Sequence, residues 1–318
     1  LLSRPARDAD VKRELRGGVG LDADRDVALP GILGDLAQLH VAGAEVEAPV
    51  WMFIQSDPSS QFSSISTQLC KKIIESGQID AAKPVALLLD SGGGSPEAAY
   101  QLARYLQKHC GEFYVLVPSY AKSAATLLSL GADKIVLGSR AELGPLDMQL
   151  RDFDEESEFS ALNHVQTLER LRAFALVTMD AFVALTVQRS GKRISTVLPL
   201  AMEFSNTMIR PLMENVDVVR YTEMSRILKI GEDYARRLLI RRGYKDEDAD
   251  NIAAALVGNY PDHSFVIDAE ECEEIGLDVE APSVKLAKLF EQICPLMDNL
   301  TVHGKLVEGG SGKRDAQQ

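Results

Sequence analysis

One segment of the sequence constrains the fold more than any other: a hydrophobic strand pattern that runs directly into three glycines and then into a helix pattern. The strand pattern covers residues 85–89, and the helix pattern begins at Pro96. Between them lie Gly92, Gly93 and Gly94. A short apolar run with these bounds is typical of a buried parallel strand, and glycines let the backbone turn with its amides exposed. The segment therefore predicts backbone N–H groups and a helix N-terminus that face an anion or a developing oxyanion.

The same order of elements recurs further along the chain. Residues 115–118 predict a strand and residues 123–130 a helix, with Ser123 at the turn between them. Such a serine caps the helix in many proteins. Alternatively, it is a nucleophile, and the next residue, Ala124, gives its amide to the oxyanion. The motif G-x-S-x-G is absent, so this is not the nucleophile elbow of α/β-hydrolases.

Glycine-rich turns also bind phosphates and dinucleotides, and that alternative is disfavoured here. The motif G-x-G-x-x-G is incomplete, because Glu97 stands where its last glycine belongs. We therefore expect no nucleotide cofactor at this turn. The four cysteines are scattered without a C-x-x-C pair, which predicts no metal site and a reducing compartment. A net charge of −13 argues against a general nucleic-acid-binding surface.

The chain divides into regions of different composition. Residues 1–48 are an extension, first charged and then rich in Gly, Ala and Asp, and residues 301–318 are a flexible tail. Residues 49–300 carry the folded domain. Strand and helix patterns alternate between residues 49 and 137, which implies an α/β fold with a parallel sheet and right-handed crossovers. From residue 155 to about 240 the pattern changes to long helices, which predicts a helical insertion.

Two parts of this helical region allow a second interpretation. Residues 221–243 predict two short helices broken at Ile230 and Gly231, and the acidic net charge favours a helical hairpin over a DNA-binding helix-turn-helix. Residues 173–187 are strongly apolar, but Asp180 interrupts them and the run is too short to span a bilayer. We therefore expect no nucleic-acid partner and no membrane span. The arginines of the first segment are expected on a solvated face: Arg236, Arg237, Arg241 and Arg242.

A serine nucleophile needs a base, and the histidines are the first candidates. His263 lies in a proline-bounded loop that leads into a predicted short strand at residues 264–267, although a structural loop histidine would look the same. Asp147 stands just past the strand that follows the serine helix, at the sheet edge where active groups collect. Alone, it would be a turn aspartate. The other histidines lie in the extension, at a helix end, on a solvated helix and in the tail: His40, His109, His164 and His303.

Four motifs in this order resemble the serine dehydrogenase proteinase family, a branch of the Clp protease/crotonase superfamily that is related to signal peptide peptidase A. They are D-S-G-G-G at residues 90–94, Y-A-K-S-A-A-T at residues 120–126, L-G-P-L-D-M-Q at residues 143–149 and Y-P-D-H at residues 260–263. The resemblance covers roughly residues 50–280. It implies a Clp protease/crotonase-like ββα spiral with an added helical region.

The resemblance also implies a function. It suggests a serine peptidase with a triad of Ser123, Asp147 and His263, which would act on protein or peptide substrates without a cofactor. The oxyanion donors would be the amides of Ala124 and of Gly94 or Gly93. Relatives of this fold form closed assemblies, so a homo-oligomer is expected. The expected location is the cytoplasm, unless an anchor precedes the first residue.

Two features depart from the related families. Clp proteases have their histidine soon after the serine helix, where Gly144 stands here, so the base must come from elsewhere and His263 is the candidate. Signal peptide peptidases use a lysine; Lys122 adjoins the serine and is expected to point away from it, which leaves Lys192 as an open alternative. Two other functions stay open: an acyl-CoA-processing crotonase-like enzyme that uses the same amides, and a non-catalytic oligomeric scaffold.

Overall fold

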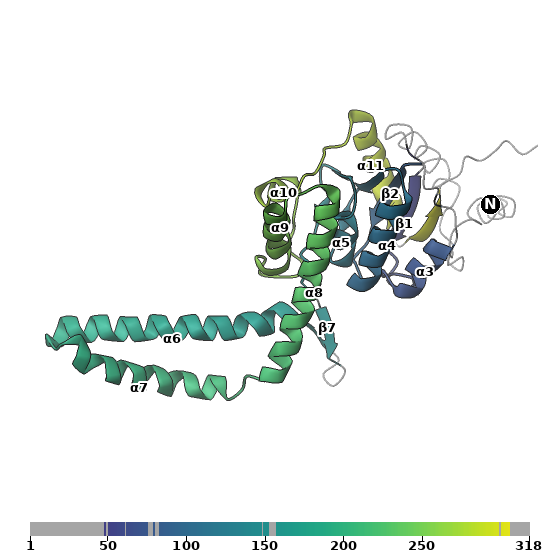
Figure 1. The fold of residues 1–318 in the computed structure, drawn as a ribbon. Coiled ribbons are helices and arrows are strands. Elements are labelled where there is room, and N and C mark those ends of the chain that lie inside the picture. The colour runs from purple at the N-terminus through teal and green to yellow at the C-terminus, as the bar shows by residue number, and fades with distance from the viewer. Residues whose placement is uncertain are drawn as a thin grey trace, which may run out of the picture. The chain divides into compact units, whose positions relative to one another are not determined.

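The structure is a computed structural model, and it describes residues 48, 50–60, 62–75, 79, 83–147, 149–152, 157–298 and 300–305. Apart from Ala48, the predicted extension lies outside these residues. The chain forms two compact units, drawn in Figure 1. The first combines Leu1–Leu146 with Gly231–Gln318, and the second is Asp147–Ile230. The second unit overlaps the predicted helical insertion.

The first unit is built on a five-stranded sheet with the strand order β5-β3-β2-β1-β9. Four of the strands are parallel and alternate along the chain with helices, which confirms the predicted α/β arrangement. The side chains of β1 and β2 are buried along the whole strand, as strands covered on both faces require. The strands are β1 (Val50–Gln55), β2 (Val85–Asp90), β3 (Phe113–Val117), β5 (Lys134–Leu137) and β9 (Thr301–Lys305). The connecting helices are α3 (Thr67–Glu75), α4 (Pro96–His109) and α5 (Ala124–Ser129).

Strand β9 corrects the sequence analysis, which placed residues 301–305 in a flexible tail. The strand pairs antiparallel with β1 and completes that edge of the sheet. Val302 and His303 are buried, and the His303 ring lies edge-on to Phe53, with ring centroids 4.7 Å apart. The segment is too short and too polar to be recognised as a strand from its sequence. It is buried because it pairs with a strand some 250 positions earlier in the chain. The remainder of the predicted tail lies outside the described residues.

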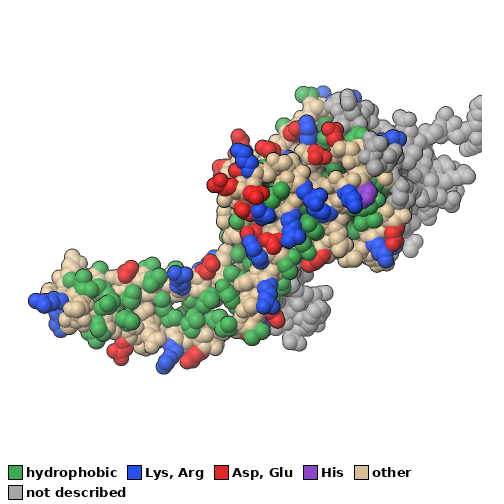
Figure 2. All heavy atoms as spheres, in the orientation of Figure 1, with side chains coloured by type: hydrophobic (Ala, Val, Ile, Leu, Met, Phe, Trp, Pro, Cys, Tyr) green, Lys and Arg blue, Asp and Glu red, His purple; other side chains and the backbone are tan. Residues whose placement is uncertain are grey.

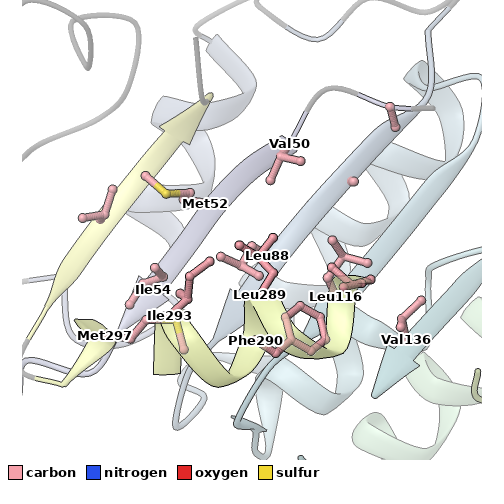
Figure 3. Packing of buried hydrophobic residues seen from close by; sticks show 14 residues of the cluster. Val50, Met52, Ile54, Leu88, Leu116, Val136, Leu289, Phe290, Ile293 and Met297 are labelled. Carbon is pink, nitrogen blue, oxygen red and sulfur yellow. The ribbon is translucent and has the colours of Figure 1, made fainter. Parts of the chain in front are cut away.

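Helix α11 (Val284–Met297) covers one face of the sheet. Figure 3 shows it lying across the strands, with Phe290 and Ile293 among the side chains of Ile54, Leu88 and Leu116. All five are buried. Burying such side chains is the main stabilising contribution to a fold of this kind, about 1.5–3 kcal/mol for each one.

Further elements of the first unit follow β3 in the chain. Strands β4 (Tyr120–Ala121) and β6 (Glu142–Leu143) form a small parallel pair, and helices α9 (Asp246–Gly258) and α10 (Ala269–Glu274) follow later in the chain. The side chain of Asp268 caps α10, as its position predicts. Residues 264–267 do not form the predicted strand; Ile267 alone makes a bridge, to Leu143.

The second unit begins with a short antiparallel pair, β7 (Gln149–Asp152) and β8 (Ser157–Ser160). Two helices, α6 (Ala161–Ser190) and α7 (Ile194–Met213), then form an antiparallel hairpin. Figure 1 shows them side by side along most of their length.

Helix α8 (Val218–Arg242) also corrects the sequence analysis. It runs without interruption through Ile230 and Gly231, where two shorter helices were predicted. A glycine inside a helix costs about 1 kcal/mol relative to alanine, which packing around a long helix can outweigh. Of the arginines expected on a solvated face, Arg237 and Arg241 are exposed, whereas Arg236 is partly covered and forms ion pairs with Asp246 and Asp250.

Helix α6 contains a segment, Val165–Ser190, whose length and apolar composition would allow it to cross a membrane. Its most apolar window has a mean hydropathy of 1.4 and no buried residues. This segment is longer than residues 173–187, the apolar run that the sequence analysis judged too short to span a bilayer. A single helix of this kind is weak evidence for a span, because the core helices of water-soluble proteins pass the same criterion.

Candidate active site

Ser123 has the most unusual backbone of the described residues. Its φ of 51° and ψ of −118° make it the one non-glycine residue with positive φ in the described part of the chain. It stands directly before α5, yet its side chain makes no capping hydrogen bond. The interpretation as an ordinary helix cap therefore fails. Such a conformation costs about 1–3 kcal/mol and occurs mostly at functional sites.

The glycine turn, residues 92–94, packs directly against this serine. A Cβ on Gly93 would lie 2.8 Å from the Lys122 carbonyl oxygen and 2.9 Å from the Ser123 Cβ. A Cβ on Gly94 would lie 2.3 Å from the Ile65 carbonyl oxygen. Both glycines also have positive φ, 111° and 146°. No other residue type could bring the backbone this close to Ser123.

Backbone hydrogen bonds fix the two turns to one another. The N–H of Ser91 donates to the Tyr120 carbonyl at 3.1 Å, and the N–H of Lys122 donates to the Ser91 carbonyl at 2.9 Å. On the other side, the N–H of Ile65 donates to the Gly93 carbonyl at 2.8 Å. The glycine turn is thus held between the segment that carries Ser123 and the segment that precedes α3.

A buried side-chain network determines which amides are available. The Gly93 N–H donates to Ser91 Oγ at 3.1 Å, Ser91 Oγ donates to Gln55 Oε1 at 2.5 Å, and Gln55 Nε2 donates to the Phe62 carbonyl at 2.8 Å. The Gly93 amide is therefore engaged. Within the described residues, the amides of Gly94 and Ala124 have no hydrogen-bond partner.

Ser91 and Gln55 were missed in the sequence analysis. Ser91 belongs to the D-S-G-G-G motif, so its position next to the glycines was a usable signal. Gln55, at the end of a hydrophobic strand, gave none.

Thr126 connects the serine helix to the segment that leads to Asp147. Its hydroxyl lies 2.6 Å from the Ala121 carbonyl oxygen and 2.9 Å from the Gly144 carbonyl oxygen. It also accepts the Gly144 N–H at 3.0 Å. A fully buried threonine with these bonds fixes both chain segments. Thr126 is the last residue of the Y-A-K-S-A-A-T motif, so the motif was a usable signal, although its bond to Gly144 was not foreseen.

Lys122 is a structural tie rather than a candidate base. Its ammonium group forms an ion pair with Glu142 at 2.8 Å and donates to the carbonyl oxygens of Leu143 and Phe265 at 3.1 Å. These three acceptors match the three N–H bonds of an ammonium group. A side chain on Gly144, where Clp proteases carry their histidine, would meet Lys122 Cδ at 2.5 Å. A side chain at that position would therefore have to displace the Lys122 side chain.

The same contacts bring the loop of His263 to this part of the first unit. Lys122 binds the carbonyl of Phe265, two residues after His263, and Ile267 exchanges backbone hydrogen bonds with Leu143. His263 is half-buried, and its Nδ1 has no hydrogen-bond partner among the described residues. The neighbouring Asp262 instead binds the hydroxyl and the N–H of Ser264, which lowers the pKa of Asp262. A buried ring nitrogen without a partner needs an explanation, and a catalytic role is one of several.

Asp147 is the first residue of the second unit. The residue is 2% exposed, and its carboxylate accepts the Leu162 N–H at 3.4 Å within that unit. Lys192, the alternative base, is exposed in the loop between α6 and α7, also in the second unit.

The other titratable groups have structural roles. Both ring nitrogens of His303 lack a partner within the described residues, and burial lowers the pKa of its imidazole to about 4. His109 contacts the Tyr105 carbonyl at the end of α4, as expected for a helix-end histidine. All four cysteines are free, and burial raises the pKa of Cys70 and Cys272 to about 12, which keeps these thiols unreactive. Among the described residues, no group of three or more histidine, cysteine or acidic side chains could hold a metal ion.

Comparison with known proteins agrees with the motifs. A family model described as "ClpP-like SDH-type serine proteinase" matches residues 48–181. The match includes the glycine turn, Ser123, Ala124 and Asp147, and it ends before His263.

Two relatives come from Methanocaldococcus jannaschii. The uncharacterized protein MJ0137 is 27% identical over 198 residues, which cover 62% of this chain and 54% of the relative. The uncharacterized protein MJ1495 is 23% identical over 196 residues, which cover 62% of this chain and 52% of the relative. The chain thus spans about half the length of these curated relatives.

Two solved structures share weaker similarity. The 1510-N membrane-bound stomatin-specific protease, a mutant, is 19% identical, with a TM-score of 0.27 over 44% of this chain and 64% of that chain. A structure described as a dehydratase/decarboxylase enzyme couple involved in polyketide beta-branching is 15% identical, with a TM-score of 0.23 over 57% of this chain and 90% of that chain. The family match, the four motifs and the parallel sheet agree with one another. Through residues 48–181, which are less than half of its length, this chain is therefore similar to the ClpP-like SDH-type serine proteinases.

Proposed function

We propose that this protein is a serine peptidase in which Ser123 is the nucleophile. The observation that carries the proposal is the strained backbone of Ser123, which keeps its hydroxyl out of the helix cap while the glycine turn packs against its Cβ. Strain of this size persists only where the surrounding structure imposes it. The glycine contacts and the backbone hydrogen bonds between the two turns supply that constraint.

In the proposed reaction, Ser123 is the nucleophile and His263 moves the protons. Ser123 Oγ attacks the carbonyl carbon of a peptide bond, and His263 takes the hydroxyl proton and passes it to the leaving amine. The peptide C–N bond breaks and an acyl-enzyme ester forms on Ser123. Water, deprotonated by the same histidine, then attacks the ester and releases the acid. The loop contact through Lys122 and the unpartnered ring nitrogen support His263 as the base.

The proposed oxyanion donors are the amides of Gly94 and Ala124. Both are unpartnered within the described residues, whereas the Gly93 amide, the other candidate, donates to Ser91 Oγ. Ala124 is the first residue of a helix, where an N–H group favours negative charge. Removing one such donor from a hydrolase typically costs about 3 kcal/mol of transition-state stabilisation.

Three further parts of the proposal rest on the family resemblance or on composition. Asp147 would fix the tautomer of His263 and stabilise its positive charge, substrates would be proteins or peptides, and no cofactor would take part. The cytoplasmic location expected from four unpaired cysteines also stays a proposal.

The test is labelling with a fluorophosphonate probe, which reacts with activated serines. Wild type should be labelled, and Ser123→Ala and His263→Ala should not. The matched control is Ser119→Ala, which removes a serine four residues before Ser123, just after β3. This variant should be labelled like wild type. Folded wild-type protein that takes up no probe, or equal labelling of Ser123→Ala, would contradict the proposal.

A further inference from the structure

The hairpin of α6 and α7 exposes an unusual amount of hydrophobic surface. Among the described residues, the exposed large hydrophobic side chains lie in the second unit, except for Val266 and Val284. Figure 2 shows hydrophobic side chains along the length of the hairpin. Those of the hairpin are Phe174, Leu176, Val177, Leu185, Ile194, Leu198, Leu200, Met202, Phe204, Met208, Leu212 and Met213. Contiguous apolar surface of this extent marks an interaction site.

The contact between the two helices accounts for little of their apolar surface. On α7, a stripe of Val197, Ala201 and Ser205 is buried, at the four-residue spacing of one helix face. Ser205 Oγ donates to the Ala175 carbonyl at 3.2 Å. The remaining faces stay exposed, and a helix that is apolar on several sides is normally covered by protein or by lipid.

Charged residues divide the hairpin into three belts. The contact of Ser205 with Ala175 and the stacking of Phe182 on Phe204, with centroids 5.0 Å apart, fix which residues of the two helices lie at the same level. The tip is basic, the middle acidic and the base basic. The tip belt is Arg189, Lys192 and Arg193, and the middle belt is Asp180 and Glu203. The base belt is Arg172 and Arg210, with Glu169 and Arg170 beside them, and is basic overall. At 1.5 Å per residue, successive belts are about 12–14 Å apart.

These belts argue against lipid as the cover. Insertion of the hairpin would carry the three basic side chains of the tip and the two carboxylates of the middle into hydrocarbon, where charges are costly. A helix lying in the membrane surface needs a strongly polar face opposite an apolar one. Exposed hydrophobic residues such as Phe174, Leu176 and Val177 surround α6 instead of gathering on one side.

The belts are complementary to a second copy of themselves. If two hairpins lie antiparallel and are offset by one belt, the acidic belt of each meets a basic belt of the other. A two-fold axis makes this contact twice. Hairpins that pair parallel in register, or antiparallel without an offset, place acidic residues against acidic ones. Like charges in contact disfavour these two pairings. Parallel hairpins with an offset would match the charges, but that contact is not two-fold and leaves each hairpin open to a further copy, so a closed dimer requires the offset antiparallel arrangement.

We propose that the α6–α7 hairpin is the self-association element of this protein, covered by the same hairpin of a second copy. The exposed leucines, phenylalanines and methionines supply the buried apolar area, and the charge belts set the direction and the offset. The hairpin sequence carries six basic and three acidic residues, whereas the whole chain has a net charge of −13. Repulsion between two acidic chains therefore disfavours contacts through the other surfaces more than contacts through the hairpin.

The experiment reverses belts on the full chain and measures mass by sedimentation velocity. Asp180→Lys/Glu203→Lys makes every belt basic and should weaken self-association by about tenfold or more. Mixing this variant with a tip variant, Arg189→Glu/Lys192→Glu/Arg193→Glu, or with a base variant, Arg172→Glu/Arg210→Glu, should restore it. If the tip variant restores association, the middle belt faces the tip belt of the second copy; if the base variant does, it faces the base belt.

Glu273→Lys/Glu274→Lys is the matched control, since it makes the same charge change on exposed residues of α10. It should associate like wild type. Far-UV circular dichroism checks that each variant keeps its helices, which substitutions of exposed residues should preserve.

Three results would overturn the proposal. They are a wild type that stays monomeric at every concentration reached, an acidic-belt variant that associates like wild type, and a failure of both mixtures to rescue. Wild type that is monomeric in solution but sediments with phosphatidylglycerol vesicles through the hairpin would assign the surface to lipid instead.

Discussion

The two units place their hydrophobic side chains in opposite ways. The first buries them on both faces of a parallel sheet, and its core includes a histidine with no hydrogen-bond partner among the described residues. The second leaves them exposed along two helices. The difference suggests a division of work. The first unit has a packed core of its own, which can hold Ser123 in a strained conformation. The second unit exposes apolar side chains, which we propose are covered by a binding partner.

The largest expected effect separates catalysis from assembly. Ser123→Ala should lower peptide hydrolysis by about 10⁶-fold, the loss found when a serine nucleophile is removed from a comparable triad. Self-association through the hairpin should not change, because the substitution leaves the second unit untouched. Turnover of a peptide library and sedimentation velocity measure the two properties. Loss of assembly together with activity would break the proposed separation of roles.

A second comparison concerns stability. Phe290→Ala, in the core beneath the sheet, should lower the free energy of unfolding by about 3–5 kcal/mol. Val177→Ala, at a position 67% exposed on α6, should change it by less than about 0.5 kcal/mol in dilute protein. Urea unfolding followed by circular dichroism gives both values. A large effect of Val177→Ala that grows with protein concentration would show the hairpin interface; a large effect independent of concentration would contradict the exposed position.

Glycine substitutions sharpen the same contrast. Gly94→Ala should destabilise the protein by about 3 kcal/mol, because its Cβ would lie 2.3 Å from a backbone oxygen of Ile65. Gly191→Ala, in the hairpin loop, has positive φ but no atom within 4 Å of the new Cβ, so about 1 kcal/mol is expected. Thermal unfolding of the two variants provides the comparison. Equal melting temperatures would mean that the glycine turn is less constrained than its contacts indicate.

The buried histidine of β9 predicts a pH dependence. Burial lowers the pKa of His303 from 6.5 to about 4, so the unfolded chain binds this proton more readily than the folded one. The free energy of unfolding should therefore fall as the pH drops from 6.5 to about 4, by up to about 3 kcal/mol from this residue. Comparing wild type with His303→Leu isolates the contribution. Parallel pH profiles would contradict it.

The sequence predicted the parts of the fold that depend on local pattern. Strands such as β2 and β3 are short apolar runs between glycine, proline and charged residues, and the helices between them carry clear start signals. The motifs around Gly94 and Ser123 also led to the two turns that the structure packs together.

What the sequence could not predict depends on distant partners. Strand β9 exists because β1 offers it an edge, and α8 runs through Gly231 with buried side chains on both sides of it, such as Leu228 and Leu238. The roles of Gln55 and Thr126 are set by hydrogen bonds across 36 and 18 positions of the chain. None of these contacts leaves a local pattern.

The central claim is that Ser123 is the activated nucleophile, and locating a covalent adduct tests it most directly. Wild-type protein is treated with diisopropyl fluorophosphate, digested and mapped by mass spectrometry. The account predicts one phosphoryl adduct, on the peptide that contains Ser123, and none in protein unfolded before treatment. An adduct on another serine, or none on folded protein, would contradict it.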